Sequence, residues 1–184
     1  MYFRVTLASA IFMTVFGLAA GAHAQMAITT FGATDASLCY QNAADDFSRD
    51  ISPCDAALSQ GGTSPADRYK TLVNRGIIKN RTGDIASAMD DFNAALAIDG
   101  TIAEAYLNRG NSHYLSGRYG EALSDYETAI AYEVNKPWAA WYNIGLAHEA
   151  MKDTEKARAA YMKALEINPE FSAAQEKLAR LGTG

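Results

Sequence analysis

Few side chains in this sequence have the types and spacing that catalysis requires. Ser112 and His113 are adjacent, but consecutive side chains of a helix point in different directions, so they do not form a nucleophile–base pair. His113 and His148 are a candidate pair for a metal, yet zinc needs further ligands, and the sequence offers none at a suitable spacing. We therefore expect a non-catalytic protein with no metal and no cofactor. A metal-dependent enzyme that uses the two histidines is the alternative.

The first residues have the pattern of an export signal. Arg4 precedes an uncharged stretch at residues 5–20, and Ala22 and Ala24 form an Ala-x-Ala cleavage site. We expect a signal peptide over residues 1–24 and an exported or secreted protein, located in the periplasm if the host is a bacterium with an outer membrane. An uncleaved membrane anchor is the alternative, although a spanning helix needs about 20 apolar residues. Once the signal is removed, we expect no membrane insertion.

The charge balance argues against a nucleic-acid partner. The chain carries 16 Lys and Arg against 21 Asp and Glu, a formal net charge of −5 at pH 7. Removal of residues 1–24 takes away only Arg4, so the charge becomes one unit more negative, at −6. Proteins that bind DNA or RNA neutralise phosphates with an excess of basic side chains.

A pattern of small and aromatic residues recurs three times between residues 69 and 171. Its spacings of three and four place these side chains on one stripe of a helix, and glycine-containing turns separate two helices per unit. Gly in the middle of a helix costs about 0.5–1 kcal/mol relative to Ala, so three glycines at one register indicate close helix packing. The glycines are Gly76, Gly110 and Gly145, followed by the alanines Ala88, Ala122 and Ala157 and the aromatics Phe92, Tyr126 and Tyr161.

These motifs resemble the tetratricopeptide repeat family. The third unit follows the family pattern with Trp141, Gly145 and His148 in its first helix and Tyr161 in its second. The resemblance implies an all-α solenoid of stacked antiparallel helix pairs, with a repeat domain at 65–184, repeats at about 69–102, 103–137 and 138–171, and a capping helix at 172–182. His113 and His148 stand where the family prefers an aromatic residue, so we expect them to be packing residues.

The segment 25–64 is predicted to be a degenerate helical hairpin followed by a linker. Residues 54–58 echo residues 92–96, so Cys54 stands where the repeats place an inward aromatic, and Cys39 lies on the partner helix. If this hairpin pairs as the others do, the two cysteines can face each other, and an oxidising compartment favours a disulfide. Two buried free thiols, or a thiol enzyme that uses Cys39, are the alternatives.

The resemblance also implies a concave groove lined by the first helix of each repeat. Asn74, Asn108 and Asn143 would lie on its floor, where an amide can both donate to and accept from the backbone of an extended peptide. The alternative is that these side chains satisfy neighbouring backbone or face solvent. Arg75 and Arg109 are expected to pack along, or pair across, the repeat interface. The other predicted groove residues are Val73, Leu107, Tyr142, Ile77, Asn111 and Leu146.

The function that the sequence favours is a non-catalytic adaptor of the cell envelope. It would bind a segment of a protein or peptide partner in the groove, with apolar anchors supplying most of the affinity. A purely structural repeat protein that self-associates through the end of the array is a further alternative, so the oligomeric state is left open.

Overall fold

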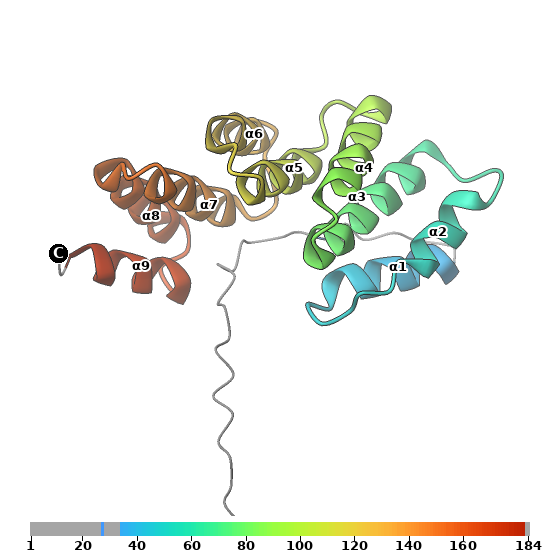
Figure 1. Ribbon diagram of the computed structural model, residues 1–184, viewed down its shortest axis with the longest axis horizontal. Helices are drawn as coiled ribbons and strands as arrows, with labels where there is room; N and C mark the ends of the chain where they lie inside the picture. The colour runs from blue at the N-terminus through green and yellow to red at the C-terminus, as the bar shows by residue number, and fades with distance from the viewer. Residues whose placement is uncertain (1–26, 28–33, 183–184) are drawn as a thin grey trace, which may run out of the picture.

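The structure is a computed structural model that describes residue 27 and residues 34–182 of the 184-residue chain. The described residues form nine helices and no strand, as expected for an all-α protein (Figure 1). The predicted signal peptide and its cleavage site lie outside the described residues. The helices are α1 (Thr34–Ala44), α2 (Ser52–Ser59), α3 (Pro65–Thr82), α4 (Ile85–Ile98), α5 (Ala103–Leu115), α6 (Tyr119–Ala131), α7 (Pro137–Ala150), α8 (Thr154–Ile167) and α9 (Ser172–Gly182).

Local sequence signals set where these helices begin and end. Ser64 is the N-cap of α3 and its hydroxyl accepts a hydrogen bond from the Asp67 backbone N–H at 3.0 Å. Pro65 follows at the first helical position, where its missing N–H costs nothing. Gly83 ends α3 in the left-handed conformation, with φ at 85°. Asp84 then caps α4 through the Ser87 N–H, which closes the turn of the first repeat.

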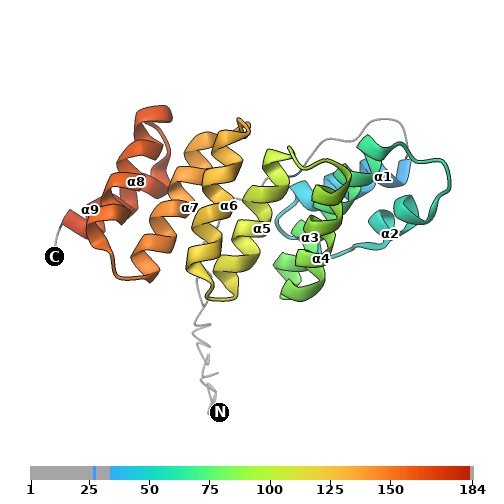
Figure 2. The same cartoon turned by 90° about the horizontal axis from the view of Figure 1, so that it is seen from above.

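Consecutive helices pair into hairpins that stack in chain order. The pairs are α1 with α2, α3 with α4, α5 with α6, and α7 with α8, and α9 covers α8 at the end of the array (Figure 2). The first helices of the repeats are close enough for α3 to contact α5 and for α5 to contact α7, whereas the second helices lie farther from one another. The stack therefore curves, with α3, α5 and α7 on its inner side (Figure 1).

The glycine register of the sequence sets the spacing within each hairpin. A Cβ placed on Gly76 would lie 2.6 Å from the Phe92 ring, and one placed on Gly110 would lie 2.6 Å from the Tyr126 ring. Gly145 meets Tyr161 in the same way. Because all three rings are fully buried, each hairpin closes by laying an aromatic ring directly over a helix backbone.

The N-terminal hairpin is joined to the repeats by Arg81, near the end of α3. Its guanidinium donates to backbone oxygens at the end of α1 and in the following loop, which an α-helix end leaves without partners. These acceptors are the carbonyls of Asn42 (3.1 Å), Ala43 (2.8 Å), Asp45 (2.7 Å) and Ser48 (3.1 Å). The Arg81 side chain is only 9% exposed, and burial lowers its pKa.

Cys39 and Cys54 meet inside the same hairpin. Both are fully buried, their Sγ atoms lie 2.11 Å apart, and their Cα atoms lie 4.8 Å apart, which is the spacing of a disulfide. When the two sulfurs are bonded, the described residues contain no free thiol. Cys39 then has no thiolate to act as the nucleophile of a thiol enzyme. In residue 27 and residues 34–182, no helix is both long and apolar enough to cross a membrane.

Candidate protein-interaction site

The predicted groove residues lie on the three first helices, but their side chains are buried. All nine are at most 5% exposed, and Asn74, Asn108 and Asn143 are fully buried. The expectation of a floor of open amides is therefore not met. The positions are Val73, Asn74 and Ile77 on α3, Leu107, Asn108 and Asn111 on α5, and Tyr142, Asn143 and Leu146 on α7. That these residues contact a peptide partner stays a prediction.

Hydrogen bonds within the stack use several of these amides. The Asn143 side chain donates to Asn111 Oδ1 at 2.9 Å, and the Tyr126 hydroxyl donates to the same oxygen at 3.0 Å. Asn108 donates to the Glu104 carbonyl one turn earlier at 2.8 Å. Asn111 thus connects the second helix of its own repeat to the first helix of the next. The alternative that these side chains satisfy neighbouring backbone is met at Asn108, whose acceptor is the Glu104 carbonyl.

In each of the first two repeats an arginine pairs with an aspartate of its own repeat and also reaches the hairpin before it. Arg75 binds Asp91 of its own repeat at 2.6 Å and Asp55 of α2 at 2.7 Å. Its hydrogen bonds to Asp91 raise the pKa of Arg75. Arg109 repeats the arrangement 34 positions later, with Asp125 at 2.7 Å and the Asn93 side chain of α4 at 2.9 Å. The predicted pairing of these arginines across the repeat interface is confirmed.

Among the described residues, the two histidines are not joined by a set of further metal ligands. His113 Nε2 lies 3.7 Å from Asp125, and the Nδ1 atoms of His113 and His148 are buried without a hydrogen-bond partner. Burial lowers the pKa of both imidazoles, which favours the neutral ring. Across the described part of the chain, no group of three or more His, Cys, Asp or Glu side chains is placed to hold a metal ion. The metal-enzyme alternative thus has no support in this geometry.

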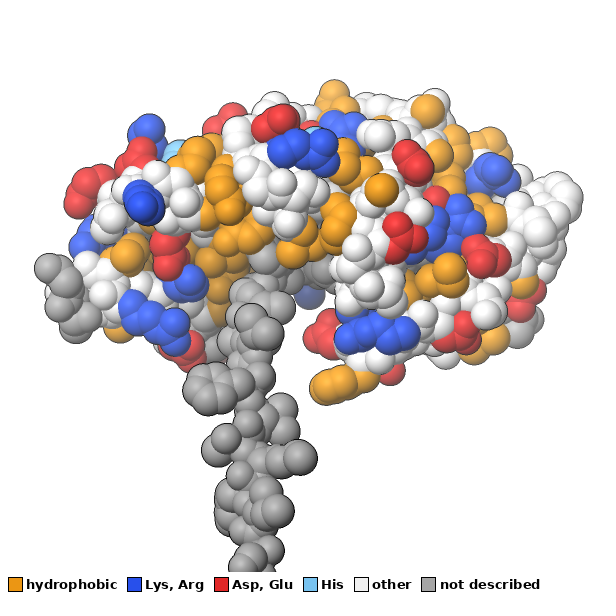
Figure 3. Space-filling model, viewed as in Figure 1, with side chains coloured by type: hydrophobic (Ala, Val, Ile, Leu, Met, Phe, Trp, Pro, Cys, Tyr) orange, Lys and Arg blue, Asp and Glu red, His pale blue; other side chains and the backbone are white. Residues whose placement is uncertain are grey.

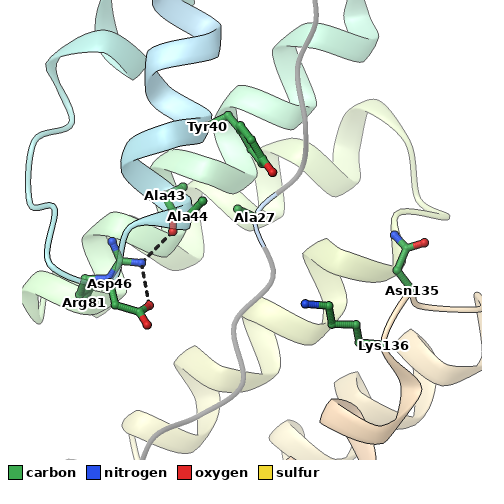
Figure 4. A pocket seen from close by; sticks show the side chains of 8 residues that line it. All are labelled: Ala27, Tyr40, Ala43, Ala44, Asp46, Arg81, Asn135 and Lys136. Atoms are coloured by element: carbon green, nitrogen blue, oxygen red, sulfur yellow. Dashed lines mark hydrogen bonds and ion pairs between the residues drawn. The ribbon is translucent and has the colours of Figure 1, made fainter. Parts of the chain in front are cut away.

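The inner side of the arch contains a cavity of about 370 Å³ that the sequence did not reveal. Tyr40, Ala43 and Ala44 of α1 form one wall, in which two methyl groups lie beside the Tyr40 phenol, and Arg81 lines the cavity from α3 (Figure 4). Across the opening lies the loop before α7, so the cavity joins segments far apart in the sequence. Figure 3 shows the hollow under the arch from the side. The remaining lining residues are Ala27, Asp46, Asn135 and Lys136.

The charges of this cavity differ in their freedom to bind a partner. The Arg81 guanidinium already donates to carbonyls at the end of α1 and in the following loop. Lys136 is exposed, and its side chain points toward the opening (Figure 4). Asp46 is 91% exposed and lies 3.7 Å from Arg81. Lys136 is therefore the cation best placed to meet an incoming group.

Comparison with known proteins shows what the second and third repeats are similar to. A family model described as "Tetratricopeptide repeat" matches residues 103–133 and 138–171. The chain is 32% identical over 103 residues to human "Tetratricopeptide repeat protein 6", covering 55% of this chain and 19% of the relative. It is 30% identical over 115 residues to "Heat shock protein STI1" of Saccharomyces cerevisiae, covering 61% of this chain and 19% of that protein. It thus spans about a fifth of the length of either relative.

Solved structures share the fold. The second TPR domain of the human RPAP3 protein, solved in complex with the HSP70 peptide SGPTIEEVD, superposes with a TM-score of 0.59 at 21% identity, covering 65% of this chain and 98% of that domain. Tetratricopeptide repeats are non-catalytic interaction modules, which supports the expectation that this protein is not an enzyme. Residues 103–133 and 138–171 match the tetratricopeptide repeat model, and they lie within an all-α solenoid whose fold the solved repeat structures share.

Proposed function

We propose that this protein is an exported interaction module that binds a segment of another protein on the inner side of its arch. The observation that carries this proposal is the cavity on the inner side of the arch, formed jointly by α1, α3 and the loop before α7. Binding sites are typically concave and combine apolar walls with a few placed polar groups. The relatives add support, because a domain of the same fold was solved with a bound peptide.

The chemistry of the cavity suggests the kind of segment it accepts. Its wall of Tyr40, Ala43 and Ala44 offers two methyl groups and an aromatic ring to a small apolar side chain, and the rest of its lining is polar. The exposed ammonium of Lys136 on the opposite side favours an acidic group nearby in the partner. The partner segment would therefore place an apolar anchor next to a carboxylate.

Export and a disulfide are part of the same proposal. The leader pattern at residues 1–24 and the disulfide spacing of two buried cysteines are consistent with an oxidising compartment. Intact-mass measurement of protein purified from the envelope fraction tests both points. We expect the mass of residues 25–184 with Cys39 and Cys54 both resistant to alkylation until the protein is reduced under denaturing conditions. A full-length mass, or two thiols that alkylate without reduction, would contradict the proposal.

A pull-down with matched variants tests the binding site. Wild-type protein, Lys136→Glu and Lys152→Glu are used to capture proteins from envelope extract, and captured proteins are quantified by mass spectrometry. Lys136 lines the cavity, whereas Lys152 is an exposed lysine in the turn between α7 and α8 and does not line it. We expect Lys136→Glu to lose at least one protein that wild type and Lys152→Glu both retain. Identical capture by all three proteins would remove the cavity from the proposal.

A further inference from the structure

One position near the end of the first helix differs in its response to pH between the repeats. It is occupied by Lys79, His113 and His148, which are 34 and 35 residues apart, the period of the array. Histidine changes its charge at about pH 6.5, whereas lysine stays cationic up to about pH 10. His113 and His148 are also the only histidines after residue 24. Mild acid therefore acts on the second and third repeats at this position, and not on the first.

The carboxylate available to this position also changes along the array. Lys79 Nζ lies 2.8 Å from Asp91, so the charge of this lysine is paired. His113 Nε2 lies 3.7 Å from Asp125, which stands 34 residues after Asp91. The third repeat has Ala160 at the corresponding place, 35 residues after Asp125. A cation at this position thus has an aspartate beside it in the first two repeats, and this aspartate is missing from the third.

Protonation of His113 would be only partly compensated. The Asp125 carboxylate already accepts two hydrogen bonds from Arg109, at 2.7 Å and 2.8 Å. The second ring nitrogen of His113, Nδ1, is buried and has no hydrogen-bond partner among the described residues. Burial lowers the pKa of the ring, Asp125 and Glu121 act against that effect, and Arg118 and Arg109 reinforce it.

Protonation of His148 would be compensated less. Its Nδ1 is likewise buried without a partner, and no described carboxylate forms an ion pair with the ring. Burial lowers the pKa of His148, Asp153 and Glu127 act against that effect from a distance, and Lys156 reinforces it. A second N–H on this ring would therefore be buried without an acceptor, which destabilises the folded state.

We propose that the array contains an acid-sensitive element formed by His113 and His148: as the pH falls below about 6, their protonation loosens the second and third repeats, the third most, and leaves the first intact. The sign follows from the lowered pKa of both rings. Their contribution to stability is present above the ordinary value of 6.5 and is lost as the pH falls below it, because the unfolded chain then binds more protons.

The same element would act on the inner cavity through α7. Lys136 is the N-cap of α7, which carries His148 near its other end, and Lys136 also lines the cavity. Loosening of α7 would therefore release one side of the cavity at acid pH. This effect on a partner rests on the proposed function, whereas the loosening of the repeats does not.

Thermal unfolding of the processed chain at pH 7.5 and pH 5.5 tests the element without any partner. Ordinary carboxylates stay largely ionised over this range, so the histidines dominate the change in stability. We expect the Tm of wild type to be about 2–4 °C lower at pH 5.5. The fall should be smaller in His148→Gln and absent in the double variant His113→Gln/His148→Gln. The control Lys79→Gln, at the same position of the first repeat, should show the same fall as wild type.

Amide exchange of the wild-type protein at the two pH values locates the loosening and needs no variant. After correction for intrinsic exchange rates, protection in α7 and α8 should drop at least about threefold more than protection in α3 and α4. A Tm of wild type that is equal at both pH values, or a fall that persists in the double variant, would overturn the inference. A drop in protection that is uniform over the four helices would overturn it as well.

Discussion

The close approach of Gly110 to the Tyr126 ring makes the repeat packing testable with a single methyl group. In Gly110→Ala the new Cβ would lie 2.6 Å and 2.7 Å from two ring carbons and 3.3 Å from the Ala122 carbonyl oxygen. Carbon atoms normally pack at about 3.5–4.0 Å, so the overlap with the ring is about 1 Å. The ring cannot easily retreat, because it is fully buried and its hydroxyl is bound to Asn111.

The expected loss of stability in Gly110→Ala is the balance of two opposing contributions to the free energy of unfolding. Overpacking a core typically costs about 1–3 kcal/mol, and an overlap this large against a fixed ring belongs at the upper end of that range. Replacing Gly by Ala within a helix returns about 1 kcal/mol. We therefore expect Gly110→Ala to lower the free energy of unfolding by about 2 kcal/mol, which corresponds to a fall in Tm of about 4–8 °C for a domain of this size.

The matched control is the same substitution at Gly120, in the first turn of α6. A Cβ there meets no atom within 4 Å, and the residue is exposed with an ordinary helical φ. Gly120→Ala should leave stability unchanged or raise it by up to about 1 kcal/mol. Unfolding is followed by circular dichroism in urea and on heating. If Gly110→Ala is as stable as Gly120→Ala, the close helix packing derived from the glycine register is refuted.

Three further changes test the N-terminal hairpin and the C-terminal cap. Cys54→Ala should lower stability by about 3 kcal/mol and make Tm insensitive to reductant, whereas the Tm of wild type falls on reduction; equal sensitivity of the two proteins would contradict the bond. Arg81→Met leaves several backbone carbonyls of the α1 loop without their donor and should cost at least about 2 kcal/mol, with faster amide exchange confined to α1 and α2. Burial opposes the charge of Glu149, but hydrogen bonds from Tyr161 and Lys177 hold its pKa below the ordinary value of 4.5. The stability that the Glu149 carboxylate adds is present above that value and is lost as the pH falls through the folded pKa. The difference in Tm between wild type and Glu149→Gln should therefore shrink between pH 5 and pH 3. A difference in Tm that stays constant over this range would exclude the carboxylate as its source.

The helix pairs were predictable because their signals are local. A helix register is set by spacings of three and four residues, and a glycine at one register facing an aromatic in the next helix appears in the sequence as a fixed offset. Gly76 with Phe92 and Gly110 with Tyr126 share the same 16-residue separation, and both contacts exist in the structure. Such pairs need only one hairpin to form, so no knowledge of distant parts of the chain is required.

The burial of the amides was not predictable from the same pattern, although one signal was present. The periodicity says which face of a helix a residue occupies, but not how much of that face neighbouring elements cover. Differences between the repeats carry this information. Where the first repeat has Ile77 opposite Phe92, the second has Asn111 opposite Tyr126, so an amide appears together with the hydroxyl that binds it. A polar residue that changes together with its neighbour across a hairpin indicates an internal pair.

The arginine and aspartate of each pair also change together between repeats, because a repeat that lacks one lacks the other. In the third repeat, Ile144 stands at the position of Arg109 and Ala160 at that of Asp125, and both are buried. The charge and its partner are lost together, because either one alone would leave a buried charge without compensation. Arg81 has no such counterpart, since Leu115 occupies its position in the second repeat. It serves the degenerate first hairpin alone, and therefore no repeat comparison could have predicted it.

The burial of the amides on α5 and α7 limits which substitutions can test partner recognition. The described polar contacts of α5 and α7 lie largely inside the stack, where Asn111 and Asn143 hold neighbouring repeats together. Replacing Asn143 with Ala would remove a buried hydrogen bond worth about 1 kcal/mol, so weaker binding by that variant would not distinguish a contact residue from a structural one. Lys136 is exposed and has no such structural bond among the described residues. A loss of binding in Lys136→Glu with unchanged Tm would therefore locate recognition at the rim of the cavity, and a fall in Tm without a specific loss of partner would contradict it.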